Sequence, residues 1–200
     1  MLESLLKNSK LISEIKGFCQ EKGILDIILF GSVVRGKRKP NDIDVALIFK
    51  DKEDLDIAYE LRKVFESEGI EVEVVALTYK KIFDPGFLPR ENILSEGYSL
   101  VNGGFLSESL GLASYEAFIY NLKKFSQSDR MRFHYSLNGR GGNKGFLEET
   151  NSIRLAAAVI LVPVKNAEKF GDYLGSWEIE YRRVRVLVPK SVSEYGGFDG

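Results

Sequence analysis

Two acidic residues and a Gly-Ser pair have the types and the spacing that phosphate chemistry requires. An apolar run over residues 27–30 stops at Gly31 and Ser32, and Asp42 and Asp44 open the next apolar run. Residues two apart on a strand point to the same face, so the two carboxylates would lie about 6 to 7 Å apart. Like charges at that distance repel by roughly 2 kcal/mol at an effective dielectric constant of about 20. We therefore expect a cation between them.

The residue types of the acid pair and of the Gly-Ser pair indicate which cation it is. Mg²⁺ (or Mn²⁺) commonly takes one or two protein carboxylates together with the phosphates of a substrate. Gly31 allows the backbone to approach a ligand closely, and Ser32 would stand near the start of a helical turn whose amide groups favour phosphate. Ser32 is also a good helix N-cap, and the two roles are compatible. The stretch predicts nucleotide phosphate chemistry.

Three short segments resemble the Gly-Ser…Asp-x-Asp signature of the minimal nucleotidyltransferases in the DNA polymerase β superfamily: Gly31-Ser32, Arg35-Gly36 and Asp42-Ile43-Asp44. The resemblance covers about residues 10–103. The segment between the Gly-Ser pair and the acid pair is one residue shorter than in many relatives. The resemblance implies that Asp42 and Asp44 are catalytic metal ligands. It also implies that Gly31, Ser32 and Arg35 bind the phosphates of a nucleoside triphosphate.

In this superfamily a third carboxylate on the neighbouring strand completes the metal site. The predicted strand over residues 70–77 carries Glu71 and Glu73, which point to the same face, so their spacing does not separate them. The sequence Val-Glu-Val-Val around Glu73 resembles the family position. That position is often Asp, so a Glu would need a slightly different backbone offset to reach the metal. We expect Glu73 to be the third metal ligand and catalytic carboxylate.

Helical and strand patterns alternate through the first half of the chain. Apolar spacing predicts helices over residues 2–22 and 51–68, strands over 24–30, 43–49 and 70–77, and then a short helix around Asn92 and an edge segment over 98–101. This order favours an α/β (α+β) layer fold. With the resemblance, it implies a polymerase β-like nucleotidyltransferase sheet with flanking helices. Gly103 and Gly104 indicate a boundary, so residues 1–104 form the expected nucleotidyltransferase domain.

Residues 105–200 are expected to form a small α+β C-terminal domain of unassigned role, suited to acceptor or partner binding. The patterns predict helices over 106–125, 126–132 and 166–174, a basic loop over 139–145, strands over 158–164 and 178–188, and a frayed tail over 191–200. Basic residues such as Lys124 and Arg132 interleave with aromatic ones such as Phe125. They could contact an acceptor strand through phosphates and stacking, or form ordinary solvated surface.

Composition and length limit the class of protein that this chain can be. The 200 residues are 44% hydrophobic and 28% charged, with a net charge of −1, so bulk charge does not indicate a nucleic-acid binder. A chain of this length can bury a core without disulfides, and its one cysteine, Cys19, is expected to pack inside a helical pattern. No apolar run approaches about 18 residues, and the start lacks signal-peptide features. We expect a cytoplasmic protein without membrane contact.

These observations predict a Mg²⁺-dependent nucleotidyltransferase. It would move a nucleoside monophosphate from a nucleoside triphosphate to an acceptor hydroxyl by a two-metal mechanism and release pyrophosphate. The expected acceptor is an RNA or a protein, and a protein partner or a homodimer is also compatible with the sequence. The alternative is a non-catalytic nucleic-acid-binding or antitoxin-like interaction protein on the same fold. Nothing in the sequence selects the base or the acceptor.

Overall fold

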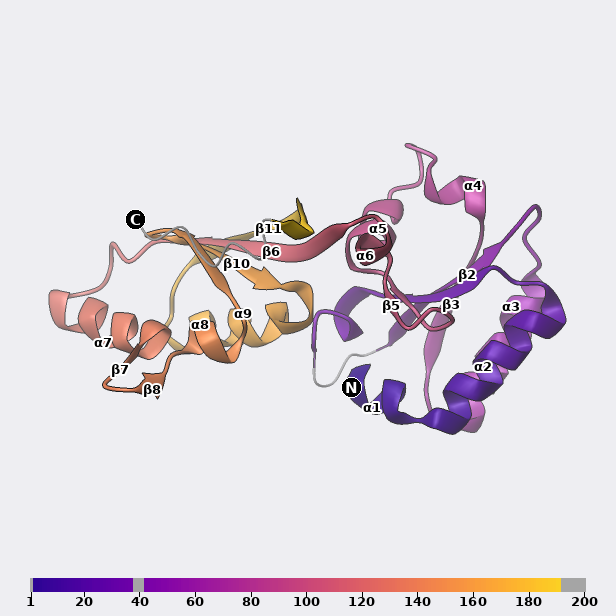
Figure 1. Cartoon of the computed structure of the whole chain (residues 1–200), viewed down its shortest axis with the longest axis horizontal. Coiled ribbons are helices and arrows are strands. Elements are labelled where there is room, and N and C mark those ends of the chain that lie inside the picture. The colour runs from indigo at the N-terminus through magenta and orange to yellow at the C-terminus, as the bar shows by residue number, and fades with distance from the viewer. Residues whose placement is uncertain (1, 38–41, 192–200) are drawn as a thin grey trace. The chain divides into compact units, whose positions relative to one another are not determined.

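The computed structural model describes residues 2–37 and 42–191. The chain divides into two compact units, Met1–Gly111 and Leu112–Gly200 (Figure 1). The division lies between Gly111 and Leu112, later in the chain than the boundary expected at residue 104. Each unit has its own sheet and its own hydrophobic core. In the part of the chain that the structure describes, no helix is both long and apolar enough to cross a bilayer.

The first unit is built on a mixed five-stranded sheet with the order β3-β2-β1-β4-β5. Its strands are β1 (Asp26–Phe30), β2 (Ile43–Phe49), β3 (Val72–Thr78), β4 (Tyr98–Ser99) and β5 (Gly104–Phe105). β2 and β3 run parallel, whereas β1 pairs antiparallel with both β2 and β4. The predicted mixed α+β layer fold is confirmed for this unit.

Helices cover both faces of this sheet, as Figure 1 shows. They are α1 (Leu2–Lys7), α2 (Ser9–Lys22), α3 (Leu55–Ser67), α4 (Tyr79–Ile82), α5 (Arg90–Glu96) and α6 (Leu106–Ser109). Ile27 and Leu29 of β1 pack with α2 and α3, and Ile28 and Phe30 pack with α4 and α5. Both faces of the central strands are therefore buried, which explains their continuous apolar runs.

Side-chain caps shift two helix starts from the predicted positions. The helix predicted over residues 2–22 is interrupted at Asn8, whose side chain accepts a hydrogen bond from the Leu11 amide at 3.1 Å and starts α2. The helix predicted from residue 51 begins only at Leu55, because the Asp54 carboxylate accepts from the amides of Asp56 and Ile57. In both cases a polar side chain satisfies amides that the first turn leaves unpaired.

Cys19 packs on the inner face of α2 and is 4% exposed. Burial, with a smaller contribution from the charge of Asp26, raises the pKa of the thiol to about 11. We expect iodoacetamide to alkylate Cys19 at pH 8 on the order of 100-fold more slowly in the native protein than in urea, because the thiolate is the nucleophile. Mass spectrometry of timed samples measures both rates, and equal rates would contradict this burial.

The same shift predicts how alkaline pH affects stability. The thiol ionises at a lower pH in the unfolded chain than in the folded chain, so the unfolded state loses its proton first. Cys19 therefore makes its full contribution to the free energy of unfolding below the ordinary thiol pKa. This contribution is lost as the pH rises toward about 11.

The second unit is an antiparallel four-stranded sheet, in the order β11-β6-β10-β9, with helices on one face. Its strands are β6 (Leu112–Tyr120), β9 (Ile153–Ala156), β10 (Val159–Pro163) and β11 (Tyr181–Pro189), and its helices are α7 (Gln127–Asn138), α8 (Phe146–Glu149) and α9 (Ala167–Ser176). Phe118, Phe133 and Phe170 form the centre of the core between sheet and helices. An ionic cluster lies beside it, in which Arg183 donates to Glu116 and to Glu168.

Several expectations for this half were wrong. The predicted helix over 106–125 is helical only at Leu106–Ser109 and then becomes strand β6. β6 is a central strand whose residues Tyr115–Phe118 are buried on both faces, so this stretch lacks the alternation that marks a half-buried strand. The predicted basic loop over 139–145 contains a hairpin of β7 (Gly139–Arg140) and β8 (Asn143–Lys144). The predicted tail lies, from residue 192 on, outside the described residues.

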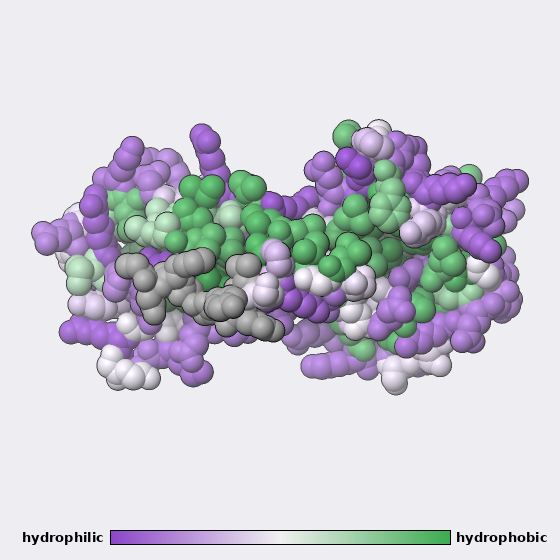
Figure 2. All heavy atoms as spheres, turned by 45° about the horizontal axis from the view of Figure 1, so that its top comes forward, coloured by the Kyte–Doolittle hydropathy of each residue, from purple (hydrophilic) through white to green (hydrophobic). Residues whose placement is uncertain are grey.

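The sheet of the second unit is also apolar on the face opposite its helices. Tyr115, Ala117 and Leu161 form a small cluster there, and Ile153 and Val186 pack against it. Figure 2 shows apolar residues gathered on the face of this unit that is turned toward the viewer. Val184 and Ile119 are 49% and 43% exposed. The second unit therefore combines a helix-covered core with an apolar outer face.

Candidate active site

The register of three neighbouring strands brings two of the predicted carboxylates, Asp44 and Glu73, side by side. Asp44 on β2 lies opposite Phe30 on β1 and beside Glu73 on β3, and Asp42 lies just before β2 begins. Asp44 is half-buried, whereas Asp42 and Glu73 are exposed. Glu71 lies outside β3 and is also exposed. Of the two glutamates that spacing left open, the structure places Glu73 directly beside Asp44.

Gly31 lies against Asp44 so closely that a larger residue would not fit. Its φ is +75°, and a Cβ added there would lie 1.9 Å from Oδ2 of Asp44. From Gly31 the chain makes a short 3-10 turn over Gly31–Val33, and the Gly31 carbonyl accepts from the Arg35 amide at 3.3 Å. Val33 and Val34 are completely buried and anchor the turn in the core. The Gly-Ser turn and the Asp44 carboxylate thus form one local unit.

The carboxylates interact through their charges. Burial raises the pKa of Asp44, the negative charges of Asp42 and Glu73 raise it further, and the Arg35 guanidinium opposes both effects. A cation placed among the three carboxylates would reverse this repulsion and favour the ionised form of Asp44. The local field therefore suits a bound cation.

Glu96 is a member of this site that the sequence analysis missed. It is the last residue of α5, it is fully buried, and its Oε1 accepts from the Gly31 amide at 3.1 Å and from Nη1 of Arg35 at 2.8 Å. One signal could have found it, because Glu96 follows Ile93 by three residues and helical spacing puts both on the buried face. Gly31 and Arg35 thus have a protein acceptor, and their predicted phosphate contacts stay predictions.

The donor set suits magnesium chemically, although the carboxylates do not enclose a metal position. Within residues 2–37 and 42–191, no three His, Cys, Asp or Glu side chains form a group able to hold a metal ion. Asp42, Asp44 and Glu73 offer only carboxylate oxygens, which Mg²⁺ and Mn²⁺ prefer. Mg²⁺ commonly takes one or two carboxylates from a protein and its remaining ligands from water and substrate phosphates, and Asp42, just before β2, and Asp44, on β2, offer two such carboxylates.

Comparison with protein families assigns this part of the chain. The family model described as nucleotidyltransferase domain matches residues 12–98, which include the Gly-Ser turn, the three carboxylates and Glu96. Residues 12–98 therefore match the nucleotidyltransferase-domain family model. The mixed sheet with helices on both faces is the polymerase β-like arrangement that the sequence predicted.

Two solved structures are similar to parts of this chain. One is a mutant of the toxin-antitoxin MntA-HpeT, with 18% identity, a TM-score of 0.35 and coverage of 44% of this chain and 70% of that chain. The other is a complex of a tri-AMPylated Shewanella oneidensis HEPN toxin with MNT antitoxin, with 21% identity, a TM-score of 0.34 and coverage of 50% and 76%. No curated protein matches the chain significantly.

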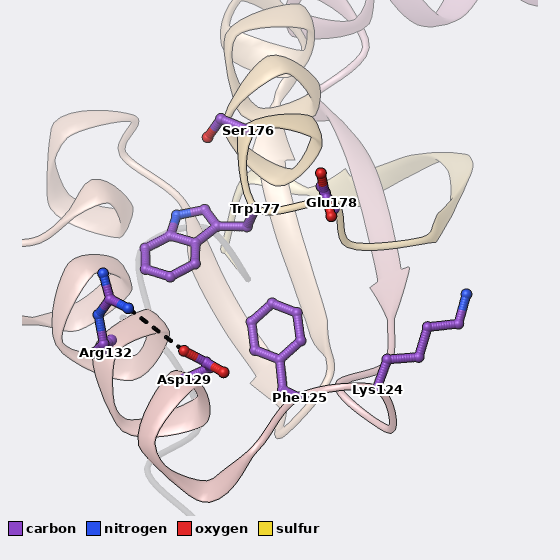
Figure 3. Close-up of a pocket in the computed structure, with 7 residues that line it drawn as sticks. All are labelled: Lys124, Phe125, Asp129, Arg132, Ser176, Trp177 and Glu178. Atoms are coloured by element: carbon purple, nitrogen blue, oxygen red, sulfur yellow. Dashed lines mark hydrogen bonds and ion pairs between the residues drawn. The ribbon is translucent and has the colours of Figure 1, made fainter.

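Outside the nucleotidyltransferase domain, the second unit contains an open pocket of about 720 Å³. Figure 3 shows the rings of Phe125 and Trp177 in it, with charged side chains around them. Both cations among them are paired: Lys124 binds Glu180 at 2.5 Å and Arg132 binds Asp129 at 3.5 Å. The acceptor-binding basic surface considered for this region is thus a surface of mixed charge.

Proposed function

We propose that this chain is a metal-dependent nucleotidyltransferase that transfers a nucleoside monophosphate to an acceptor hydroxyl. The observation that carries the proposal is the strand register, which puts Asp44 against Gly31 on one side and beside Glu73 on the other. The turn proposed to bind phosphate and the carboxylates proposed to bind metal therefore lie at one end of the sheet. The family match of residues 12–98 supports the same reaction class.

The residues have distinct proposed roles. Asp42 and Asp44 would hold Mg²⁺ or Mn²⁺, which supplies positive charge to the triphosphate and to the attacking oxygen when it is bound. The Ser32 hydroxyl would donate to a phosphate oxygen, and Glu73 would accept the proton of the acceptor hydroxyl. Because phosphoryl transfer depends mainly on positioning and charge stabilisation, these few groups are sufficient for the chemistry.

The bond changes are those of an in-line displacement. The acceptor oxygen forms a bond to the α-phosphorus, and the bond from that phosphorus to the oxygen bridging to the β-phosphate breaks. The bridging oxygen leaves with its electron pair as part of pyrophosphate. The acceptor hydroxyl is proposed to belong to an RNA or to a protein, including a partner chain or a second copy of this chain.

Labelled nucleotides test the proposal directly. The purified full chain is incubated with Mg²⁺ or Mn²⁺, with cellular RNA or cellular protein, and with each triphosphate labelled at the α-phosphate. We expect label in one of the two fractions, release of one pyrophosphate per transfer, and loss of both with EDTA. The γ-labelled triphosphate is the matched control, because nucleotidyl transfer leaves the acceptor unlabelled whereas a kinase labels it.

The proposed enzymatic function would be overturned in favour of the non-catalytic alternative by three results together. These are no nucleotide transfer, no metal-dependent triphosphate binding in calorimetry, and salt-sensitive binding of RNA or DNA. Calorimetry of metal-dependent binding is the direct test here, because no three His, Cys, Asp or Glu side chains within residues 2–37 and 42–191 form a group able to hold a metal ion.

A further inference from the structure

The buried carboxylate of Glu96 lies at a rigid junction between α5 and the sheet. Gly97 follows it, and a Cβ there would lie 2.2 Å from the Ile93 carbonyl oxygen and 2.8 Å from Cγ2 of Ile28 on β1. The Gly97 amide also donates to the Ile93 carbonyl at 2.9 Å, which ends α5. The helix end is therefore pressed onto β1, the strand that leads into the Gly-Ser turn. Glu96 has little freedom to move relative to that turn.

The two donors that reach Glu96 come from the two ends of the predicted phosphate-binding segment. Gly31 is its first residue, and Arg35 lies four residues on, with 19% of its side chain exposed. Both donate to the same atom, Oε1. Because the guanidinium is mostly buried, it requires a charged acceptor to offset its loss of hydration. One carboxylate oxygen thus fixes both the backbone and the cation of this segment.

We infer that Glu96 is a positioning residue that holds Gly31 and Arg35 in the geometry required for triphosphate binding. This inference rests on the proposed nucleotidyl transfer. Glu96 acts through the turn and does not contact the triphosphate or the metal. Its hydrogen bond to Gly31 sets the start of the turn, and therefore the direction in which Ser32 presents its hydroxyl. Its ion pair with Arg35 keeps a positive charge near Asp44, on whose carboxylate that charge acts.

Glu96→Gln tests the inference, because the amide has nearly the same shape but lacks the charge. Glu91→Gln is the matched control, since Glu91 lies on the same helix with its side chain exposed. We expect Glu96→Gln to raise the KM for the triphosphate at least tenfold, with a smaller change in kcat per folded molecule. Glu91→Gln should leave both unchanged. A merely structural role would lower the fraction of folded protein and its Tm, and would leave the KM of the folded molecules unaltered.

A double-mutant cycle with Arg35→Gln tests whether Glu96 acts through Arg35. If it does, the double variant has a KM close to that of the more affected single variant. An unchanged KM in Glu96→Gln, or effects of the two changes that multiply independently, would overturn the inference. Catalysis by the wild-type chain in the same assay shows that the proposed function itself holds.

Hydrogen exchange gives a readout that does not depend on catalysis. We expect the Gly31 amide to exchange at least tenfold faster in Glu96→Leu than in the wild type, because leucine offers no acceptor, while amides of β2 keep their protection. Unchanged protection at Gly31 overturns the positioning role whether or not the chain transfers nucleotides. A wild-type chain without any transfer, but with a Gly31 amide that responds to Glu96→Leu, would instead refute the proposed function and leave Glu96 as the residue that holds the turn.

Discussion

Asp44→Asn is expected to lower kcat for nucleotidyl transfer by about 10³-fold or more, because it removes the carboxylate that lies against the Gly-Ser turn. The fold should persist, since asparagine has nearly the same shape. The pKa of Asp44 is raised by burial and by its acidic neighbours, so its charged form opposes folding at neutral pH. Stability should therefore stay equal or increase in the variant. Single-turnover kinetics and thermal unfolding measure the two effects.

Asp51→Asn is the matched control for this substitution. Asp51 follows β2, is exposed, and undergoes the same change of charge and shape. We expect its transfer rate to remain within about twofold of the wild type, because Asp51 is exposed and lies beyond the opposite end of β2 from Asp44, where solvent and salt screen its charge. Full turnover by a purified Asp44→Asn protein would remove Asp44 from the mechanism.

Gly31→Ala should also abolish most of the transfer, by about 10²-fold, although it changes no charged or hydroxyl group. Its added Cβ would lie 1.9 Å from Oδ2 of Asp44, so either the carboxylate or the turn must move. A misplacement of about 1 Å near the chemistry can cost about 10²-fold in rate. The left-handed φ of +75° adds a destabilisation of about 1 to 2 kcal/mol. Transfer kinetics and denaturant unfolding separate the two effects.

Gly69→Ala separates backbone strain from displacement of Asp44. Gly69 has a φ of +71°, almost equal to that of Gly31, but nothing lies within 4 Å of a Cβ added there. We expect it to lose about 1 to 2 kcal/mol of stability and to keep its transfer rate. Equal losses of activity in both variants would mean that strain alone, and not contact with Asp44, explains the effect at Gly31.

The sequence predicted the three longer strands of the first unit well, because their apolar runs are bounded by clear breakers, whereas the two-residue strand β5 was missed. β2 has the predicted bounds, and β1 and β3 differ from prediction by about two residues or fewer at each end. The same reasoning failed for β6, where burial on both faces removed the alternation that separates a strand from a helix. Asn8 divided a predicted helix through one capping hydrogen bond that spacing does not reveal.

Within the site, the short Gly-Ser and acid-pair stretch and the neighbouring position of Glu73 were predictable, whereas the contacts of Glu96 were not. Gly31, Ser32, Asp42 and Asp44 belong to one short stretch whose spacing carries its own geometry. Glu96 reaches Gly31 and Arg35 across 65 and 61 residues of sequence, so only the folded chain shows that they meet. The pairing of Lys124 with Glu180 across 56 residues is similar, and it neutralises a cation that looked available in the sequence.

The antiparallel pairing of β1 and β2 has a consequence for how this family can vary. Because Phe30 and Asp44 are ladder partners, backbone hydrogen bonds fix the separation between the start of the Gly-Ser turn and Asp44. Strand pairing sets that separation, independently of the length of the segment that connects the turn to the acid pair. Evolution or a protein engineer could lengthen this segment to recruit a new acceptor without rebuilding the chemistry.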